Sequence, residues 1–130
     1  MKHIAGVAVA LSMGAAASLA SPSLECSINA SSQVETGQCL ADLEETVQAA
    51  LDVTLKFARQ SARELDGVTG RDVALPALET AQARWEDFRA AECDYAGALF
   101  GGGSGTGIEI RSCRIELTRQ RIKALTARLR

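Results

Sequence analysis

Three long stretches of this 130-residue chain repeat apolar residues at helical spacing, and segments rich in glycine separate them. The first covers about residues 32–65, the second runs from Pro76 to about Phe100, and the third follows residue 107. Apolar residues that recur every three or four positions give each helix one apolar face. Because each face must be buried against another element, the pattern predicts an all-α fold, an antiparallel three-helix bundle.

The apolar stripe of each predicted helix gives the expected core. The second stripe holds the only tryptophan of the chain, and a large aromatic side chain is what a small core is built around. The expected core positions are Leu40, Leu43, Val47, Leu51, Leu55, Ala58, Ala62 and Leu65 in the first helix, Leu78, Ala81, Trp85, Phe88, Tyr95 and Leu99 in the second, and Ile108, Ser112, Ile115, Thr118, Ile122, Leu125 and Leu129 in the third.

Short motifs mark where the helices begin. Ser32-x-x-Glu35 and Thr106-x-x-Glu109 match the capping box, in which two side chains satisfy free backbone N–H groups at a helix start. Pro76 suits the first turn of the second helix, where its missing N–H costs nothing. These signals predict starts near residues 32, 76 and 106.

The segments between the helices carry turn-forming residues. Residues 66–72 predict a turn by composition. Residues 101–107 contain five glycines, too many to hold a helix, so they predict a loop. Residues 21–30 are polar and without periodicity, which predicts an extended arm that Cys26 ties down.

The first 20 residues have the composition of a secretory signal peptide. Lys2 gives a positive start, residues 4–19 are almost wholly apolar or small, and Ala20 ends a small-x-small pattern that signal peptidase accepts. The apolar run is too short for a membrane span. We therefore expect a signal peptide over 1–20, one helical domain over 21–130 and no membrane anchor on the mature chain, which would be periplasmic or secreted.

All four cysteines lie after the predicted cleavage point, and an even number in an exported chain predicts disulfides. Zinc is the competing interpretation, but no two cysteines have the C-x-x-C spacing. Cys93 and Cys113 lie at similar distances from the glycine-rich segment, so a hairpin of helices places them nearly level. This predicts Cys93–Cys113 and leaves Cys26–Cys39, although crossed pairings remain open at this stage.

The sequence offers little for catalysis. The only histidine, His3, falls in the predicted signal peptide, which removes histidine-based triads and metal sites from the mature chain. Carboxylate pairs such as Glu44 with Glu45, or Glu86 with Asp87, are adjacent on a helix and point about 100° apart. We therefore expect a protein that is not an enzyme and holds no metal or cofactor.

Charge is unevenly distributed along the chain. Residues 21–66 hold 8 acidic and 3 basic residues, whereas residues 108–130 hold 7 basic and 2 acidic residues. One explanation is that the basic third helix packs near the acidic first helix. The other is that the acidic face attracts a cationic protein and the basic face an anionic envelope polymer. The balance does not favour nucleic acid.

The second and third helices also carry a series of spaced motifs. They read Gln82-x-x-Trp85-x-x-x-Arg89-x-x-x-Cys93, then Gly102-Gly103-Ser104 and Cys113, then Leu117-Thr118-x-x-Arg121-x-x-x-Leu125. This series resembles the signature of the LprI-type lysozyme-inhibitor family, small exported bacterial domains, and the resemblance covers about residues 26–125. The first helix departs from the family pattern Asp-x-x-Leu-Asn-x-x-Tyr, because Lys56 and Arg59 replace the Asn and the Tyr.

The resemblance implies inhibition of lysozyme by protein–protein contact. Loops on rigid scaffolds often carry recognition, so the expected contact is Gly102, Gly103, Ser104, Gly105 and Thr106. The acidic residues Asp42, Glu45 and Asp52 would assist encounter, while Gln82, Trp85, Arg89 and Arg121 would hold the scaffold. Arg89 is expected to meet Glu92 or a carboxylate of the first helix, and Gln82 a backbone group. The alternative function is a structural or stress-related envelope protein that binds peptidoglycan or an anionic cell-wall polymer through the basic third helix.

Overall fold

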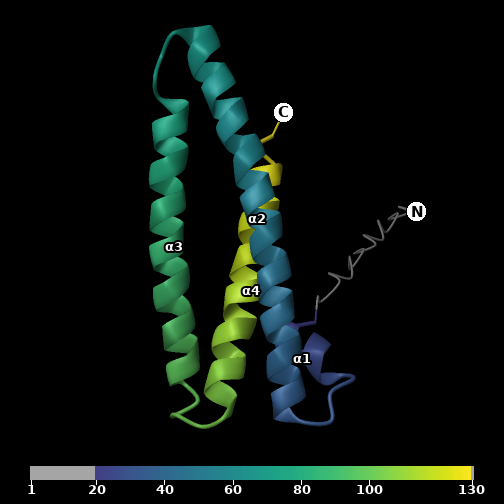
Figure 1. The fold of residues 1–130 in the computed structure, drawn as a ribbon. Helices are drawn as coiled ribbons and strands as arrows, with labels where there is room; N and C mark the ends of the chain where they lie inside the picture. Colours follow the sequence, from purple (N-terminus) through teal and green to yellow (C-terminus); the bar gives the residue numbers. More distant parts are fainter. Residues whose placement is uncertain (1–19, 130) are drawn as a thin grey trace, which may run out of the picture.

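A computed structural model describes residues 20–129, which form one short and three long helices: α1 (Pro22–Ser27), α2 (Gln33–Thr69), α3 (Ala74–Ala98) and α4 (Gly105–Thr126). The long helices run alternately up and down and lie side by side, with α1 against the lower part of α2 (Figure 1). No strand occurs within residues 20–129. The predicted three-helix bundle is confirmed, whereas the predicted signal peptide lies, except for Ala20, outside the described residues.

The short helix α1 replaces the extended arm predicted for residues 21–30, so that prediction was wrong. The Oγ of Ser21 accepts the backbone N–H of Leu24, and Pro22 stands in the first turn, where proline is tolerated. With only six residues, α1 is too short to show a helical period in the sequence. Contacts with the rest of the protein therefore decide its conformation.

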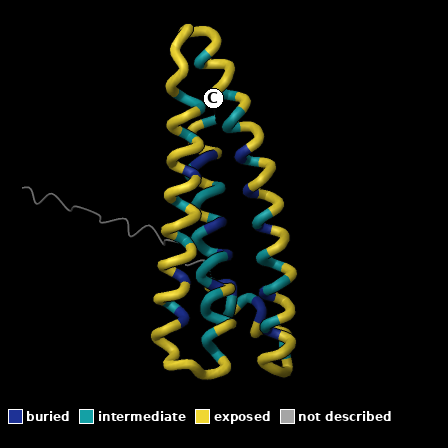
Figure 2. Tube along the Cα trace, turned by 60° about the vertical axis from the view of Figure 1, so that its left-hand side comes forward, coloured by how far each residue is buried: buried dark blue, intermediate teal, exposed yellow. Residues whose placement is uncertain are grey.

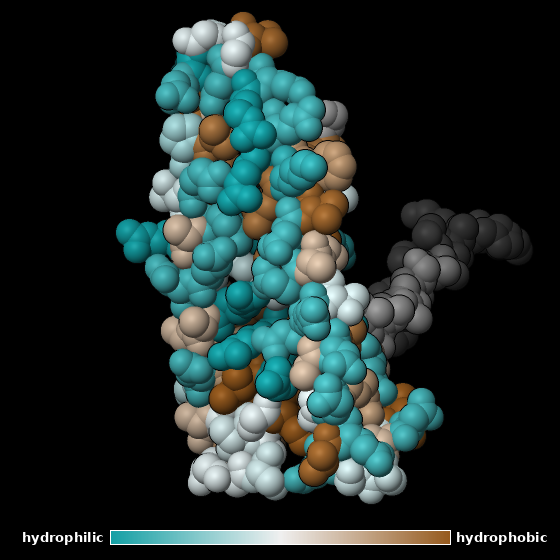
Figure 3. Space-filling model, in the orientation of Figure 1, coloured by the Kyte–Doolittle hydropathy of each residue, from teal (hydrophilic) through white to brown (hydrophobic). Residues whose placement is uncertain are grey.

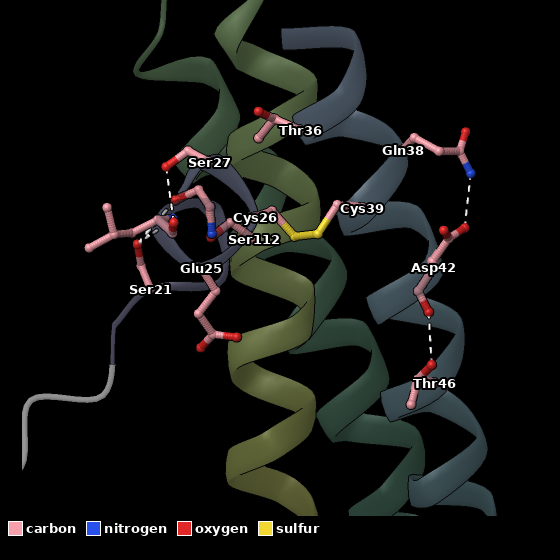
Figure 4. Close-up of a disulfide and its surroundings, with 12 residues drawn as sticks. Ser21, Glu25, Cys26, Ser27, Thr36, Gln38, Cys39, Asp42, Thr46 and Ser112 are labelled. Carbon is pink, nitrogen blue, oxygen red and sulfur yellow. Dashed lines mark hydrogen bonds between the residues drawn. A yellow bond between two sulfur atoms is a disulfide. The ribbon is translucent and has the colours of Figure 1, made fainter. Parts of the chain in front are cut away.

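Those contacts bind α1 to both α2 and α4. The disulfide Cys26–Cys39 joins α1 to α2, and the backbone N–H of Ser23 donates to the Oγ of Ser112 on α4 at 3.1 Å (Figure 4). Glu25 accepts two hydrogen bonds from the guanidinium of Arg119, at 2.8 and 2.9 Å. This fork lowers the pKa of Glu25, because a hydrogen-bonded carboxylate resists protonation.

The two ends of α2 differ from the predicted boundaries in instructive ways. At its start, the Oγ of Ser32 accepts the backbone N–H of Glu35, as in a capping box, but the Glu35 carboxylate accepts from Ser31 instead of Ser32. At its end, α2 continues through most of the predicted turn to Thr69. Gly70 stops it in the left-handed conformation, at φ 64°, which favours glycine.

Asp66, in the last turn of α2, caps the start of α3 in place of the N-cap residue of α3 itself. Its carboxylate accepts the backbone N–H groups of Val73, Ala74 and Leu75 at 3.2, 2.8 and 2.9 Å. Val73, which stands at the N-cap position of α3, makes no side-chain cap. The three donors lower the pKa of Asp66. Pro76 stands in the first turn of α3, as predicted.

The core consists of two apolar clusters along the bundle, formed mainly by the predicted stripes of α2 and α4. Leu65 is the exception in these stripes, since it is exposed. Cys26 of α1 joins one cluster, and Leu78 and Trp85 of α3 pack against the other. Figure 2 shows buried positions along the length of the bundle. One cluster lies toward the glycine-rich segment and the other toward the α2–α3 turn. The buried members are Cys26, Leu40, Val47 and Ile115 in the first cluster, and Leu51, Leu55 and Leu125 in the second.

The stripe predicted for α3 was largely wrong. Its buried residues are Gln82, Cys93 and Gly97, and Trp85 is half-buried. The predicted core residues Ala81, Phe88, Tyr95 and Leu99 are exposed. The helix is rotated because its disulfide and its polar side chains face α2 and α4, and these specific bonds outweigh the burial of aromatic side chains that have no partner.

Candidate functional site

The connection from α3 to α4 is a six-residue loop, residues 99–104, shorter than the predicted loop over 101–107. Gly101 and Gly102 take the left-handed conformation, at φ 65° and 87°, which other residues rarely adopt. Gly105, Thr106 and Gly107 instead form the first turn of α4. Of the expected contact residues, Gly102, Gly103 and Ser104 are therefore in the loop, and Gly105 and Thr106 are in the helix.

The capping box predicted at Thr106 was also wrong. Thr106 lies inside the first turn of α4, and its buried Oγ1 has no hydrogen-bond partner within the described residues. Position 105 favours glycine because the Phe100 ring lies close to it: a Cβ there would come within 2.9 Å of the ring. The loop is thus folded closely onto the start of α4.

Two disulfides stabilise this end of the bundle, which we call the glycine-loop end. Cys93–Cys113 joins α3 to α4 with a Cα–Cα distance of 5.5 Å, and Cys26–Cys39 joins α1 to α2 at 5.7 Å. The predicted pairing is confirmed and the crossed pairings are excluded. Each closure contributes about 3 kcal/mol, chiefly by restricting the unfolded chain.

A groove of about 490 Å³ lies beside the loop, between the first turns of α2 and the first turns of α4. In Figure 3, apolar brown and pale surface gathers at this lower end of the molecule. The lining residues are Gln33, Val34, Gly37, Gln38 and Ala41 from α2, and Ser104, Gly107, Ile108 and Arg111 from the loop and α4.

Two glycines far apart in sequence widen the groove. A Cβ added to Gly37 or to Gly107 would meet no atom within 4 Å, so a side chain at either position would project into open space. Sequence reasoning missed this site. It took Gly107 only as part of a loop, and nothing in the sequence shows that Gly37 and Gly107 lie across one groove.

The α2 wall of the groove continues as an acidic stripe. Val34, Gln38 and Ala41 are followed at helical spacing by Glu45 and Asp52, so all five share one face of α2. Glu45 and Asp52 are exposed, and neither forms an ion pair with a described residue. The structure thus places these two predicted acids on the groove face.

Asp42, the third predicted acid, lies at the edge of this face. It is exposed, forms no ion pair within the described residues, and accepts a hydrogen bond from the side chain of Gln38 at 2.9 Å (Figure 4). Gln38 itself lines the groove. Asp42 is therefore linked to the groove by a neighbouring side chain.

Ion pairs with acidic residues occupy much of the basic face of α4. Arg111 and Arg114 approach the carboxylate of Glu44 at 2.8 and 3.8 Å, and Arg119 binds Glu25. The explanation that α4 packs near the acidic part of the chain therefore accounts for three of its bases. Exposed pairs of this kind add little stability, but they neutralise the surface locally.

The signature residues form a polar network inside the bundle. Arg89 donates to the Oε1 of Gln48 at 3.0 Å and to the Oγ1 of Thr118 at 2.9 Å, and Arg121 donates to the Oε1 of Gln82 at 3.0 Å. The expected carboxylate partner of Arg89 and the expected backbone partner of Gln82 were wrong. Amide and hydroxyl oxygens of α2 and α4 replace the expected carboxylate at Arg89. The guanidinium of Arg121 and the carboxylate of Glu86 replace the expected backbone group at Gln82.

Trp85 organises this network. The guanidinium carbons of Arg89 and Arg121 lie 4.8 and 5.8 Å from the centre of its ring, within cation–π range. Burial lowers the pKa of Arg121, whose buried Nη2 finds no hydrogen-bond partner among residues 20–129. Trp85 packs against the second apolar cluster, and the network shares no residue with the groove, so its geometry fits the predicted scaffold role.

The carboxylate pairs diverge as helix geometry requires. Glu44 binds Arg111 while Glu45 faces solvent, and Glu86 accepts from Gln82 while Asp87 approaches Arg84.

Within residues 20–129, no group of three or more histidine, cysteine, aspartate or glutamate side chains is placed to hold a metal ion. None of the helices described here is long and apolar enough to cross a membrane.

These features define a small disulfide-linked helical domain whose candidate site is a recognition groove. Comparison with protein families gives the class more closely. Residues 25–125 match the model described as "Lysozyme inhibitor LprI", and the chain belongs to that family. No curated protein and no solved structure matches the chain.

Proposed function

We propose that this protein is an exported, non-catalytic inhibitor that binds a lysozyme by protein–protein contact at the glycine-loop end. The family match supports the target class. The observation that carries the proposal is the groove between Gly37 and Gly107, which is continuous with an acidic stripe on α2. Of the expected contact residues 102–106, Ser104 lines this groove, and the others would contact the partner beside it.

The groove has the composition of an interface centre. Val34 is 82% exposed on one wall, Ile108 lies on the other, and the glycines leave room for a side chain from the partner. Protein interfaces typically combine such an apolar centre with a polar rim. The carboxylates of Asp42, Glu45 and Asp52 would form an acidic rim that attracts a cationic lysozyme and increases its association rate.

The proposed location is outside the cytoplasm. Two disulfides are typical of proteins that fold in an oxidising compartment. Residues 1–20 would direct export and be removed, leaving residues 21–130 as a periplasmic or secreted domain. The protein would then meet lysozymes without a membrane anchor of its own.

A lysis assay tests the proposal with a matched pair of variants. The oxidised protein should slow the clearing of a peptidoglycan suspension by lysozyme, and Gly37→Leu should abolish this effect by filling the groove. Gly67→Leu is the control, because Gly67 also lies in α2 with open space around it, but near the opposite end. Leucine is a better helix former than glycine, so neither variant should unfold the protein.

Unchanged lysis at micromolar excess of the wild-type protein, tested against a panel of lysozymes, would reject inhibition. Equal inhibition by Gly37→Leu and the wild type would reject the groove as the contact. If the acidic rim steers encounter, association should slow as salt increases, because screening weakens steering. Replacing Glu45 and Asp52 with Gln and Asn should remove most of that salt dependence.

The rival function, binding of an anionic cell-wall polymer through α4, receives less support from the charges. Three of the bases on α4 are already paired with Glu25 and Glu44. Sedimentation with purified peptidoglycan at low and high salt distinguishes the two functions. Salt-sensitive binding to the polymer without any effect on lysozyme would favour the rival.

A further inference from the structure

The face of α3 that was predicted to be core is an exposed apolar stripe. Phe88, Tyr95 and Leu99 are 51%, 61% and 68% exposed, and Ala77 and Ala81 continue the same face at helical spacing. The stripe covers about 33 Å of helix, from 1.5 Å per residue. α3 lies at one edge of the bundle and is exposed along most of its length (Figure 2).

Neither the bundle nor the groove uses this stripe. The buried side of α3 contacts α4 through Gln82, Cys93 and Gly97, and α2 through Arg89. The groove is lined by α2, α4 and the loop. Contiguous exposed apolar surface on a soluble domain commonly marks an interaction site, so the stripe needs a partner of its own.

If a second copy of the stripe is laid antiparallel to the first, with the two Phe88 residues opposite each other, complementary residues meet. Counted from Phe88, Arg84 lies four residues before and Glu92 four residues after. Ala81 and Tyr95 are each seven residues away, on opposite sides. Small residues and a base therefore occupy one half of the stripe, and large residues and an acid the other. Ala77 and Leu99 extend this pattern, each eleven residues from the centre.

We propose that α3 pairs with α3 of a second copy of this chain, antiparallel, about a twofold axis at Phe88. In such a self-complementary interface, residue i of one copy meets residue j of the other, and j meets i. The two Phe88 rings would meet at the axis. Tyr95 of each copy would lie over Ala81 of the other, and Arg84 would face Glu92 twice.

The charges select the antiparallel arrangement. A parallel pair would place Arg84 against Arg84 and Glu92 against Glu92, and like charges in contact are costly. Arg84 is free to change partner, because its approach to Asp87 is long, at 3.8 Å, and highly exposed. Because Tyr95 and Leu99 of one copy would each meet an alanine of the other, the two helices could also approach closely.

The dimer would leave both recognition grooves free. The stripe and the groove share no residue, and antiparallel α3 helices place the two glycine loops at opposite ends of the assembly. The protein would then present two separate binding sites. This inference does not depend on what the grooves bind.

Sedimentation of the full oxidised protein over a range of concentrations tests the dimer, with charge reversal as the specific probe. Arg84→Glu alone and Glu92→Arg alone should each raise the dissociation constant roughly tenfold or more, because each places like charges face to face. The double variant Arg84→Glu/Glu92→Arg should return it to near the wild-type value. If the single variants failed to associate because they were unfolded, combining the two substitutions would not restore the dimer.

Two further variants fix the position of the axis. Phe88→Glu should make the protein monomeric, whereas Phe57→Glu should not, although Phe57 is similarly exposed, on α2. A wild-type protein that stays monomeric at high concentration would overturn the proposal. So would a dimer that survives Phe88→Glu, or a double charge reversal that fails to restore association.

Discussion

The two ends of the bundle turn the chain by the same device but are stabilised differently. Both turns contain glycine in the left-handed conformation, Gly70 at one end and Gly101 with Gly102 at the other. The four cysteines all lie in the half of the bundle that holds the glycine loop. The α2–α3 turn relies on the backbone hydrogen bonds that the Asp66 carboxylate accepts and on the ion pair of Arg59 with Glu79, at 2.7 Å.

This difference suggests that the disulfides make the glycine-loop end rigid for recognition. The glycine-loop end carries the groove, and a preformed groove binds better because less conformational freedom is lost on binding. The α2–α3 turn end only has to reverse the chain. We therefore expect changes at the first end to alter both stability and recognition, and changes at the second end to alter stability alone.

The largest effect should come from removing the disulfide next to the loop. Replacing Cys93 and Cys113 with alanine should lower the free energy of unfolding by about 3 kcal/mol, from loop closure over a sequence separation of 20 residues. The buried Cys93 should add a cavity term. Urea denaturation measures the loss, and binding to lysozyme should weaken with it.

The matched variant removes the other disulfide. With Cys26 and Cys39 both replaced by alanine, loop entropy predicts a similar loss of stability. Binding should weaken less, because this bridge holds α1, which does not line the groove, whereas the Cys93–Cys113 bridge lies at the base of the loop whose Ser104 does. Equal binding by the two double variants would contradict the view that the Cys93–Cys113 bridge positions the loop beside the groove.

A smaller effect is expected at Gly97, which packs directly against Ile110 of α4 near the loop. A Cβ there would lie 2.5 Å from Cγ1 and 2.7 Å from Cδ1 of Ile110. Gly97→Ala should therefore lower the free energy of unfolding by about 1–2 kcal/mol through overpacking, despite the better helix propensity of alanine. In an Ile110→Ala background the same change should become stabilising. A thermal-denaturation cycle of the four proteins measures this coupling.

The sequence was sufficient for the fold because the fold depends on local patterns. The periods of α2 and α4 identified their buried faces, and the count of residues on either side of the glycine segment identified the Cys93–Cys113 pair. For α3 the same reasoning failed. Hydrophobicity alone favoured Phe88 and Tyr95, but the polar network around Trp85 and the disulfide at Cys93 determine which face points inward.

The candidate site was predictable only in part, for a geometric reason. The acids Glu45 and Asp52 could be assigned to one face of a helix from their spacing. The groove depends on Gly37 and Gly107, which are 70 residues apart in the chain and meet only in the folded bundle. The cap that Asp66 provides for α3 was missed similarly, since a composition typical of a turn hid a continuing helix.

At the α2–α3 turn end, Asp66→Ala should lower the melting temperature by several degrees without affecting binding at the groove. The variant removes the acceptor of three backbone N–H groups. Because folding lowers the pKa of Asp66, its contribution is complete above the unfolded pKa of about 4 and is lost as pH falls through the folded value. The stability difference between wild type and variant should therefore shrink below about pH 4. A difference that stays constant down to pH 2 would contradict this role.

The smallest effects should come from filling the two open glycine positions of α2 with alanine. Gly37→Ala and Gly67→Ala should each raise the free energy of unfolding by about 0.5–1 kcal/mol, because glycine is a poor helix former and a Cβ meets nothing within 4 Å at either position. Paired urea titrations measure the gain. The two ends should then separate in function: Gly67→Ala should bind lysozyme as the wild type does, whereas Gly37→Ala should bind more weakly, since its methyl group enters the groove. If Gly37→Ala gains stability and keeps full affinity, the groove is not where the partner binds, and the rigidity of that end would serve the fold alone.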